Sequence, residues 1–289
     1  EIQEIVERTN GVIAWGGAVN LAPADDIFIK INYPFAIDPR GQTLASVLAK
    51  KYAVGAEYVV IDIPMGPSAK VETMESAKKL ARDFIDLGER LGMHVECAIT
   101  YGGHPLGRAI GPALEAREAL KVLCGTKTPG SLIEKATAIA GILLELGNKA
   151  PKGQGQSLAK EILFSGKAYA KMKEIIEAQG GNPKVKPGDI QIGDKVATLN
   201  APAEGYVTHI DNKLIAQVAR AAGAPKDKGA GIILKVKRGR RVSKNEPLLE
   251  IYAENETKLT SALNIAQKIQ PLRIEGMLLK RVPELAYVE

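Results

Sequence analysis

The sequence predicts an α/β fold in which a mostly parallel sheet is flanked by helices and is followed by a smaller α+β C-terminal domain. Two observations lead to this prediction. Up to about residue 178, short and largely apolar runs alternate with longer segments of helical periodicity, as is typical of parallel strands joined by covering helices. From residue 188 onward the pattern changes to short strands separated by turn signals.

Residues 1–54 are predicted to form a helical or hinge segment. Within it, the run TLASVLAKKYAV at 43–54 places apolar side chains on one helical stripe. Ser46 and Lys50 are four residues apart, so they are expected to share a second, polar face of the same helix.

Residues 55–187 are predicted to form the α/β core. Strands are expected at 58–63 and 94–99, where the sequence is largely apolar. Helices are expected at 73–91, 110–122 and 129–147, with a further one running through about 178. The loops at 62–70 and 100–107 follow the two strands and are rich in Gly and Pro. Because open parallel sheets bind ligands at the carboxyl ends of their strands, a ligand pocket is expected there.

Residues 188–289 are predicted to form the smaller α+β domain, with helices at 212–222 and 256–268 among its strands. The most basic run, KVKRGRR at 235–241, alternates like a strand that leads into a turn, so we interpret it as a solvated hairpin. Neither aromatic platforms nor a known binding motif accompany this run, and the sequence therefore argues against a nucleic-acid partner.

Composition indicates a globular protein with an aliphatic core. Hydrophobic residues make up 45% of the chain and aromatic residues 4%, and 39 basic against 33 acidic residues give a net charge of +6. The two cysteines, Cys97 and Cys124, favour a reducing compartment over a disulfide scaffold, and Cys97 is expected to be a packing residue. No apolar run of membrane-spanning length occurs, and the first residues do not resemble a signal peptide. These observations predict a cytoplasmic protein with no membrane partner.

General motifs do not identify the chemistry. The sequence contains no GxGxxG, GxxxxGK[ST], HExxH or CxxC pattern. His104 could act as a general acid, but a His-Pro pair is more typical of a turn. From the residues alone, the prediction ends at an α/β protein that binds a ligand.

Three co-linear segments carry a more specific signal. They are PADD at 23–26, the long stretch DPRGQTLASVLAKKYAVGAEYVVIDIPMGPSAKVET at 38–73, and PLGRAIGPALEAREAL at 105–120. Together they resemble the thymidine/pyrimidine-nucleoside phosphorylase family, and in particular its archaeal AMP phosphorylase branch. The PAEGYV and GAGI segments look like the C-terminal domain of that family, which places this domain type at 188–289 and a nucleotide-binding core at 55–187.

The resemblance implies roles for four residues. The base-binding serine and lysine of the family fall on Ser46 and Lys50, and the acidic proton donor of the AMP branch falls on Asp38. Lys70 stands where pyrimidine relatives carry a phenylalanine of the base pocket, and the resemblance makes it a nucleotide contact. Asp38 precedes a proline, so turn initiation remains the alternative interpretation of that aspartate.

The implied activity is phosphorolysis of nucleoside 5′-monophosphates (AMP, also CMP and UMP) to a free base and ribose 1,5-bisphosphate. The alternatives are a pyrimidine-nucleoside phosphorylase and a non-catalytic nucleotide-binding module. Inorganic phosphate is then a co-substrate, no further cofactor is expected, and the protein is expected to be a homo-oligomer.

The resemblance also predicts what lies outside this sequence. The phosphate-binding loops of the family have no counterpart here, so the chain is expected to be a C-terminal portion of the enzyme. In some relatives a potassium ion is held partly by positions that match Leu106, Ala109 and Glu118. The remaining ligands have no match, and no metal is predicted.

Overall fold

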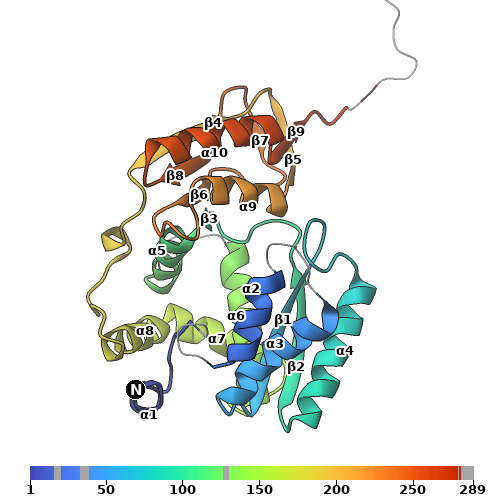
Figure 1. Ribbon diagram of the computed structural model, residues 1–289, viewed down its shortest axis with the longest axis vertical. Coiled ribbons are helices and arrows are strands. Elements are labelled where there is room, and N and C mark those ends of the chain that lie inside the picture. The colour runs from blue at the N-terminus through green and yellow to red at the C-terminus, as the bar shows by residue number, and fades with distance from the viewer. Residues whose placement is uncertain (16–20, 33–38, 126–129, 279, 281–289) are drawn as a thin grey trace, which may run out of the picture. The chain divides into compact units, whose positions relative to one another are not determined.

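The computed structural model describes residues 1–15, 21–32, 39–125, 130–278 and 280, and these fall into two compact units (Figure 1). Unit 1 consists of Glu1–Gly66, Lys70–Tyr101 and Val122–Val185. Unit 2 consists of Pro67–Ala69, Gly102–Lys121 and Lys186–Glu289. Compared with the predicted segments, residues 1–54 are grouped with the parallel strands, whereas 102–121 are grouped with the C-terminal unit.

Unit 1 is a parallel pair of strands covered by helices, as the sequence predicted. Its elements are α1 (Ile2–Thr9), α2 (Pro23–Asn32), α3 (Arg40–Ala53), β1 (Tyr58–Met65), α4 (Met74–Arg90), β2 (His94–Tyr101), α6 (Gly130–Leu146), α7 (Gly155–Phe164) and α8 (Lys167–Ala178). Strands β1 and β2 pair in parallel, with Tyr58 opposite His94 and Met65 opposite Tyr101.

The two faces of β1 contact different helices. Val59, Ile61 and Ile63 alternate along one face and join the buried cluster that contains Phe84 of α4. Asp62 points to the opposite face because strand side chains alternate, and its carboxylate pairs with Lys135 of α6 at 2.7 Å. The sheet therefore lies between α4 and α6, the layered arrangement that the alternating sequence pattern indicated.

Helix α4 begins and ends at local signals. The Thr73 side chain accepts a hydrogen bond from the backbone N–H of Ser76, which caps the first turn. Gly92 follows the helix with φ +75°, a conformation that glycine adopts without strain. Ala77 and Phe84 are buried on the inward face of this helix, whereas Met74 in its first turn is 46% exposed.

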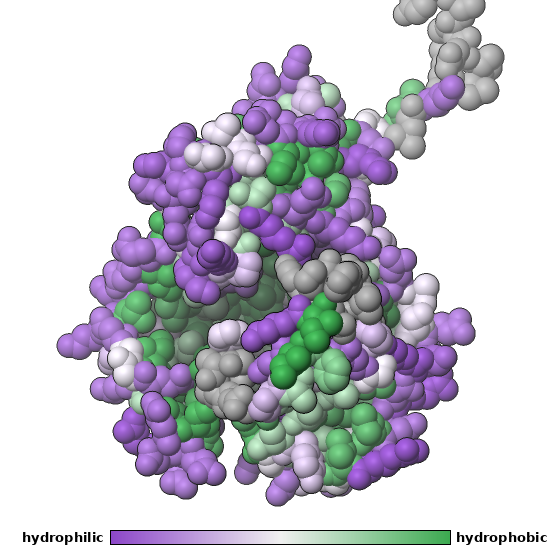
Figure 2. Space-filling view, in the orientation of Figure 1, coloured by the Kyte–Doolittle hydropathy of each residue, from purple (hydrophilic) through white to green (hydrophobic). Residues whose placement is uncertain are grey.

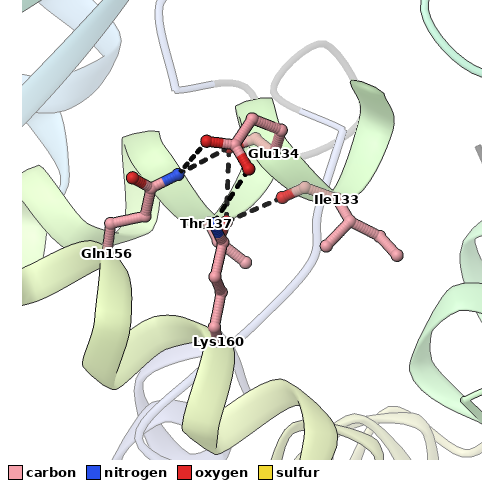
Figure 3. A network of polar contacts seen from close by, with 5 residues as sticks. All are labelled: Ile133, Glu134, Thr137, Gln156 and Lys160. Atoms are coloured by element: carbon pink, nitrogen blue, oxygen red, sulfur yellow. Dashed lines mark hydrogen bonds and ion pairs between the residues drawn. The ribbon is translucent and has the colours of Figure 1, made fainter. Parts of the chain in front are cut away.

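Helices α6 and α7 cross at close range and are joined by a polar network (Figure 3). Glu134 on α6 accepts hydrogen bonds from Gln156 at 2.7 Å and from Lys160 at 2.8 Å, both on α7. Hydrogen bonds and the charge of Lys160 lower the pKa of the Glu134 carboxyl, which keeps the network ionised at neutral pH.

Unit 2 contains two antiparallel sheets and two helices that pack on them. Its elements are β3 (Ala109–Ile110), most of α5 (Pro112–Leu123), a 3-10 turn (Pro187–Asp189), β4 (Lys195–Asn200), β5 (Gly205–Ile210), α9 (Asn212–Ala221), β6 (Gly231–Leu234), β7 (Arg241–Val242), β8 (Pro247–Ala253), α10 (Glu256–Ile269) and β9 (Leu272–Glu275). The strand orders are β3-β6-β8-β4 and β7-β5-β9.

The basic run at 235–241 does not form the predicted hairpin. Strand β6, before the run, pairs with β3 and β8, whereas β7, at its end, pairs with β5 in the other sheet. A hairpin requires the two strands to pair with each other, and here the run is a connection between sheets. Strand order depends on partners far away in the sequence, which the local alternation does not report.

Helix α2 exposes apolar side chains. Ile27, Phe28 and Ile31 are each more than half exposed, and a hydrophobic patch covers this part of the surface in Figure 2. No helix in the described part of the chain is long and apolar enough to span a bilayer.

Candidate functional site

Ser46 and Lys50 lie together on one face of α3, where both contact a single carboxylate. Asp25, in the first turn of α2, accepts a hydrogen bond from the Ser46 hydroxyl at 2.8 Å and pairs with the Lys50 ammonium at 2.8 Å. Asp25 is 9% exposed and Lys50 is 26% exposed, so the pair is largely shielded from water. Helical periodicity predicted the shared face of Ser46 and Lys50, whereas Asp25 was not predicted to have a role.

The electrostatics of this cluster keep Asp25 charged. Burial alone would raise the pKa of the Asp25 carboxyl. Hydrogen bonds from Lys50 and Ser46, together with the positive charge of Lys50, outweigh that effect, and the net pKa is lowered. At neutral pH the cluster is therefore an ionised carboxylate held by an ammonium and a hydroxyl.

A hollow of about 470 Å³ opens beside this cluster. It lies between α2 and α3 and is lined mainly by apolar side chains with a few polar ones: Ala22, Pro23, Ala24, Asp25, Phe28, Gln42, Ala45, Ser46 and Ala49. An apolar hollow with a small number of fixed polar groups at one side suits a flat heterocycle that carries hydrogen-bonding edges. We refer to it as the α2–α3 hollow.

Lys70 lies in a second hollow, of about 390 Å³, which we call the Lys70 hollow. Its lining comes from the start of α3, the loop after β1 and the start of α4: Arg40, Thr43, Lys70, Val71, Ser76, Lys79 and Leu80. Lys70 is not among the residues that line the α2–α3 hollow. The structure thus brings Ser46 and Lys50 together and places Lys70 with a different set of residues.

The loop that carries Lys70 is fixed by backbone contacts at the carboxyl end of β1. The N–H of Gly66 donates to the carbonyl of Val71 at 3.0 Å, and Met65 and Val71 form an isolated bridge. Asp38, the predicted proton donor, lies outside the described residues.

The remaining candidates have local partners. His104 contacts the carbonyl of Pro105 at 3.1 Å through Nδ1, a short-range contact of the kind expected in a turn. Burial raises the pKa of the Cys97 thiol to about 11, which makes it a poor nucleophile at neutral pH. The Glu118 carboxylate accepts hydrogen bonds from the backbone N–H groups of Arg108 and Ala109. Among the described residues, no group of three His, Cys, Asp or Glu side chains could hold a metal ion.

Known proteins match this sequence over nearly the whole chain. Residues 206–272, from β5 to β9, match the model of the pyrimidine nucleoside phosphorylase C-terminal domain. The AMP phosphorylase of Thermococcus kodakarensis is 60% identical over 282 residues, which is 98% of this chain and 56% of that protein. The AMP phosphorylases of Pyrococcus horikoshii and Methanosarcina barkeri are 59% and 58% identical over 97% and 98% of the chain.

Over nearly its whole length, the chain is similar to AMP phosphorylases. It spans about half the length of the curated relatives that it matches. The matched domain at 206–272 lies within unit 2, whereas the α2–α3 hollow and the Lys70 hollow both lie within unit 1.

The lowered pKa of Asp25 gives a pH-dependent stability in this AMP phosphorylase relative. The folded pKa lies below the unfolded value of about 3.9, so the stabilisation is complete above that value and is lost as the pH falls through the folded pKa. We expect Asp25→Asn to lower the free energy of unfolding by about 1 kcal/mol at pH 7, since Lys50 loses its nearer carboxylate and keeps only Asp26 at 3.9 Å.

Thermal unfolding of the wild type and of Asp25→Asn between pH 7 and pH 3 measures this effect. The gap between the two midpoints should begin to narrow below about pH 4, where the Asp25 carboxyl of the unfolded chain takes up a proton that the folded carboxyl, with its lowered pKa, still resists. A gap that stayed constant over this range would show that the charge of Asp25 does not stabilise the fold.

Proposed function

We propose that the protein carrying this chain is a pentosyltransferase that cleaves nucleoside 5′-monophosphates with inorganic phosphate. The products are a free base and ribose 1,5-bisphosphate, and AMP is the leading substrate, with CMP and UMP also accepted. The observation that carries this proposal is the 56–60% identity to AMP phosphorylases over nearly the whole chain.

In the proposed reaction, the base occupies the α2–α3 hollow. Ser46 lines the hollow and then faces the polar edge of the base, whereas Lys50 lies outside the lining and acts next to it through Asp25, which contacts both side chains. A phosphate oxygen attacks the anomeric carbon of the ribose, the bond from that carbon to the base nitrogen breaks, and the base leaves with the bonding electrons. Asp38 donates a proton to the imidazole ring of a purine, which makes that ring a better leaving group.

The other assignments follow from family resemblance and from the sequence. We propose inorganic phosphate as the co-substrate, with no further cofactor, and a homo-oligomer as the functional assembly. The cytoplasm is the proposed location, because the two cysteines Cys97 and Cys124 are both free thiols in the structure.

An assay of the natural protein across AMP, CMP, UMP and the matching nucleosides tests the proposal. We expect free base to appear only when inorganic phosphate is present, and faster from the monophosphates than from the nucleosides. Faster release from thymidine or uridine would favour a pyrimidine-nucleoside phosphorylase, which the name of the matched C-terminal domain keeps as the second candidate. Nucleotide binding without phosphate-dependent turnover would indicate a binding module.

Lys70→Phe extends this assay, because phenylalanine is the residue of the pyrimidine-type pocket. We expect AMP phosphorolysis to fall by at least ~10-fold, the effect of losing one charge-assisted hydrogen bond, and uridine turnover to fall much less. Unchanged AMP kinetics in this variant would remove Lys70 from the proposed nucleotide contacts.

A further inference from the structure

The Lys70 hollow lies where two helices begin. Arg40 and Thr43 are the first and fourth residues of α3, and Ser76 is the third residue of α4. The first N–H groups of a helix have no intrahelical acceptor and carry a partial positive charge. The N–H of Ser76 already donates to the Thr73 side chain and that of Thr43 to the carbonyl of Pro39, so the contribution of the two helix starts is the positive end of each helix dipole.

Three cationic side chains add to this effect. Arg40, Lys70 and Lys79 all line the hollow, and none of its described lining residues is acidic. Arg40 pairs with Asp83, which is outside the lining, and its guanidinium also donates to the carbonyl of Lys79 at 3.3 Å. These contacts fix the guanidinium at the wall of the hollow, beside the side chains of Lys70 and Lys79.

The position of the Lys70 hollow in the fold is a third, independent indication that it binds a ligand. The hollow is bounded by the loop at the carboxyl end of β1, the edge at which open parallel sheets bind ligands. The hydroxyls of Thr43 and Ser76 stand among the cations and can donate or accept hydrogen bonds. Cations, hydroxyls and helix N-termini together match the oxygens of a phosphate group.

We propose that the Lys70 hollow binds a phosphate monoester dianion, and that Arg40 and Lys79 hold the 5′-phosphate of the nucleotide there together with Lys70. The second half of this statement rests on the proposed function. It extends the site beyond the residues that the family resemblance supplied, because neither Arg40 nor Lys79 was among them.

The geometry of α3 allows one nucleotide to occupy both hollows. Gln42 lines the α2–α3 hollow and Thr43 lines the Lys70 hollow, so the two hollows adjoin neighbouring faces of one helix. From Arg40 to Ser46 the rise along the helix is about 9 Å. This separation is comparable with the distance from the base to the 5′-phosphate in an extended nucleotide.

Lys79→Gln tests the assignment with a matched control. Lys78 is the adjacent exposed lysine of α4 and is not part of the lining, so Lys78→Gln makes the same charge change outside the hollow. In the natural protein we expect Lys79→Gln to raise the KM for AMP about 10-fold, with kcat less affected. The KM for adenosine and for inorganic phosphate should stay unchanged, Lys79→Arg should restore most of the loss, and Lys78→Gln should behave as the wild type.

Other outcomes would overturn the assignment. A raised KM for inorganic phosphate would mean that the hollow serves the free co-substrate, and equal losses for AMP and adenosine would mean that Lys79 does not contact the 5′-phosphate. An unchanged KM for AMP would remove Lys79 from the site.

Calorimetric titration of the same variants with AMP and with adenosine separates this inference from the proposed function. Weaker AMP binding in Lys79→Gln, in a protein that releases no base, would support the phosphate site and reject the phosphorolysis. If the wild type and Lys79→Gln both turn over AMP with the same preference over adenosine, the phosphorolysis would be supported and the phosphate site rejected.

Discussion

Replacement of Asp38 by asparagine is expected to lower AMP phosphorolysis by about 10²–10⁴-fold, the usual range for the loss of a general acid. Asparagine has nearly the same shape but cannot donate the proton that a departing purine needs. The loss should appear in kcat, since protonation of the base develops in the transition state rather than in the bound substrate.

A comparison between bases makes this test specific. Turnover of UMP or CMP should fall much less than turnover of AMP, because a pyrimidine has no imidazole nitrogen to protonate. Near wild-type AMP turnover in Asp38→Asn would return Asp38 to the role of a turn residue before Pro39. Circular dichroism spectra of the two forms should coincide, which separates a chemical effect from a folding defect.

Gly141→Ala is expected to reduce the free energy of unfolding by about 3 kcal/mol, the upper part of the range for overpacking. A Cβ at Gly141 would lie 2.6 Å from the carbonyl carbon of Gly155 and 2.7 Å from the Cα of Gln156. These are backbone atoms of α7, so relief requires the two helices to separate. Separation would also strain the Glu134 network that joins them (Figure 3).

Gly41→Ala is the matched control for this prediction. Gly41 also lies within a helix, but a Cβ there would meet none of the described residues within 4 Å. Because alanine has the higher helix propensity, we expect Gly41→Ala to stabilise the chain by up to ~1 kcal/mol. Denaturant unfolding followed by circular dichroism measures both variants, and equal midpoints for Gly141→Ala and wild type would contradict the close crossing.

Local periodicity predicted the part of the candidate site that is local in sequence. Ser46 and Lys50 share a face because both belong to one helix, and a spacing of four residues is sufficient to infer this. Asp25 could not be paired with them in the same way, since it comes from α2 and contacts them only through the tertiary fold. Helix α2 itself was hard to predict, because Ile27, Phe28 and Ile31 are exposed rather than on a buried stripe.

The fold was predictable to a similar extent. Buried apolar runs identified β1 and β2, and alternation with helices indicated their parallel pairing, which the structure confirms. Strand β3 was missed because two residues carry no periodicity, and its partner Ile233 in β6 follows Ala109 by more than a hundred residues. Arg40 and Lys79 were missed for the same reason, since they meet only when the starts of α3 and α4 converge.

The division of unit 2 among three stretches of chain has a consequence for how the protein is made. Ala109 leaves the ribosome well before its partner Ile233, and at about 5–20 residues per second the delay is roughly 6–25 s. During that interval β3 and the adjoining residues 102–121 have no sheet to join, whereas β1 and β2 of unit 1 can already pair. Synthesis from the N-terminus therefore favours a nascent chain in which the parallel strands pair first, whereas the early segments of unit 2 can pack only after residues 186–275 have been made.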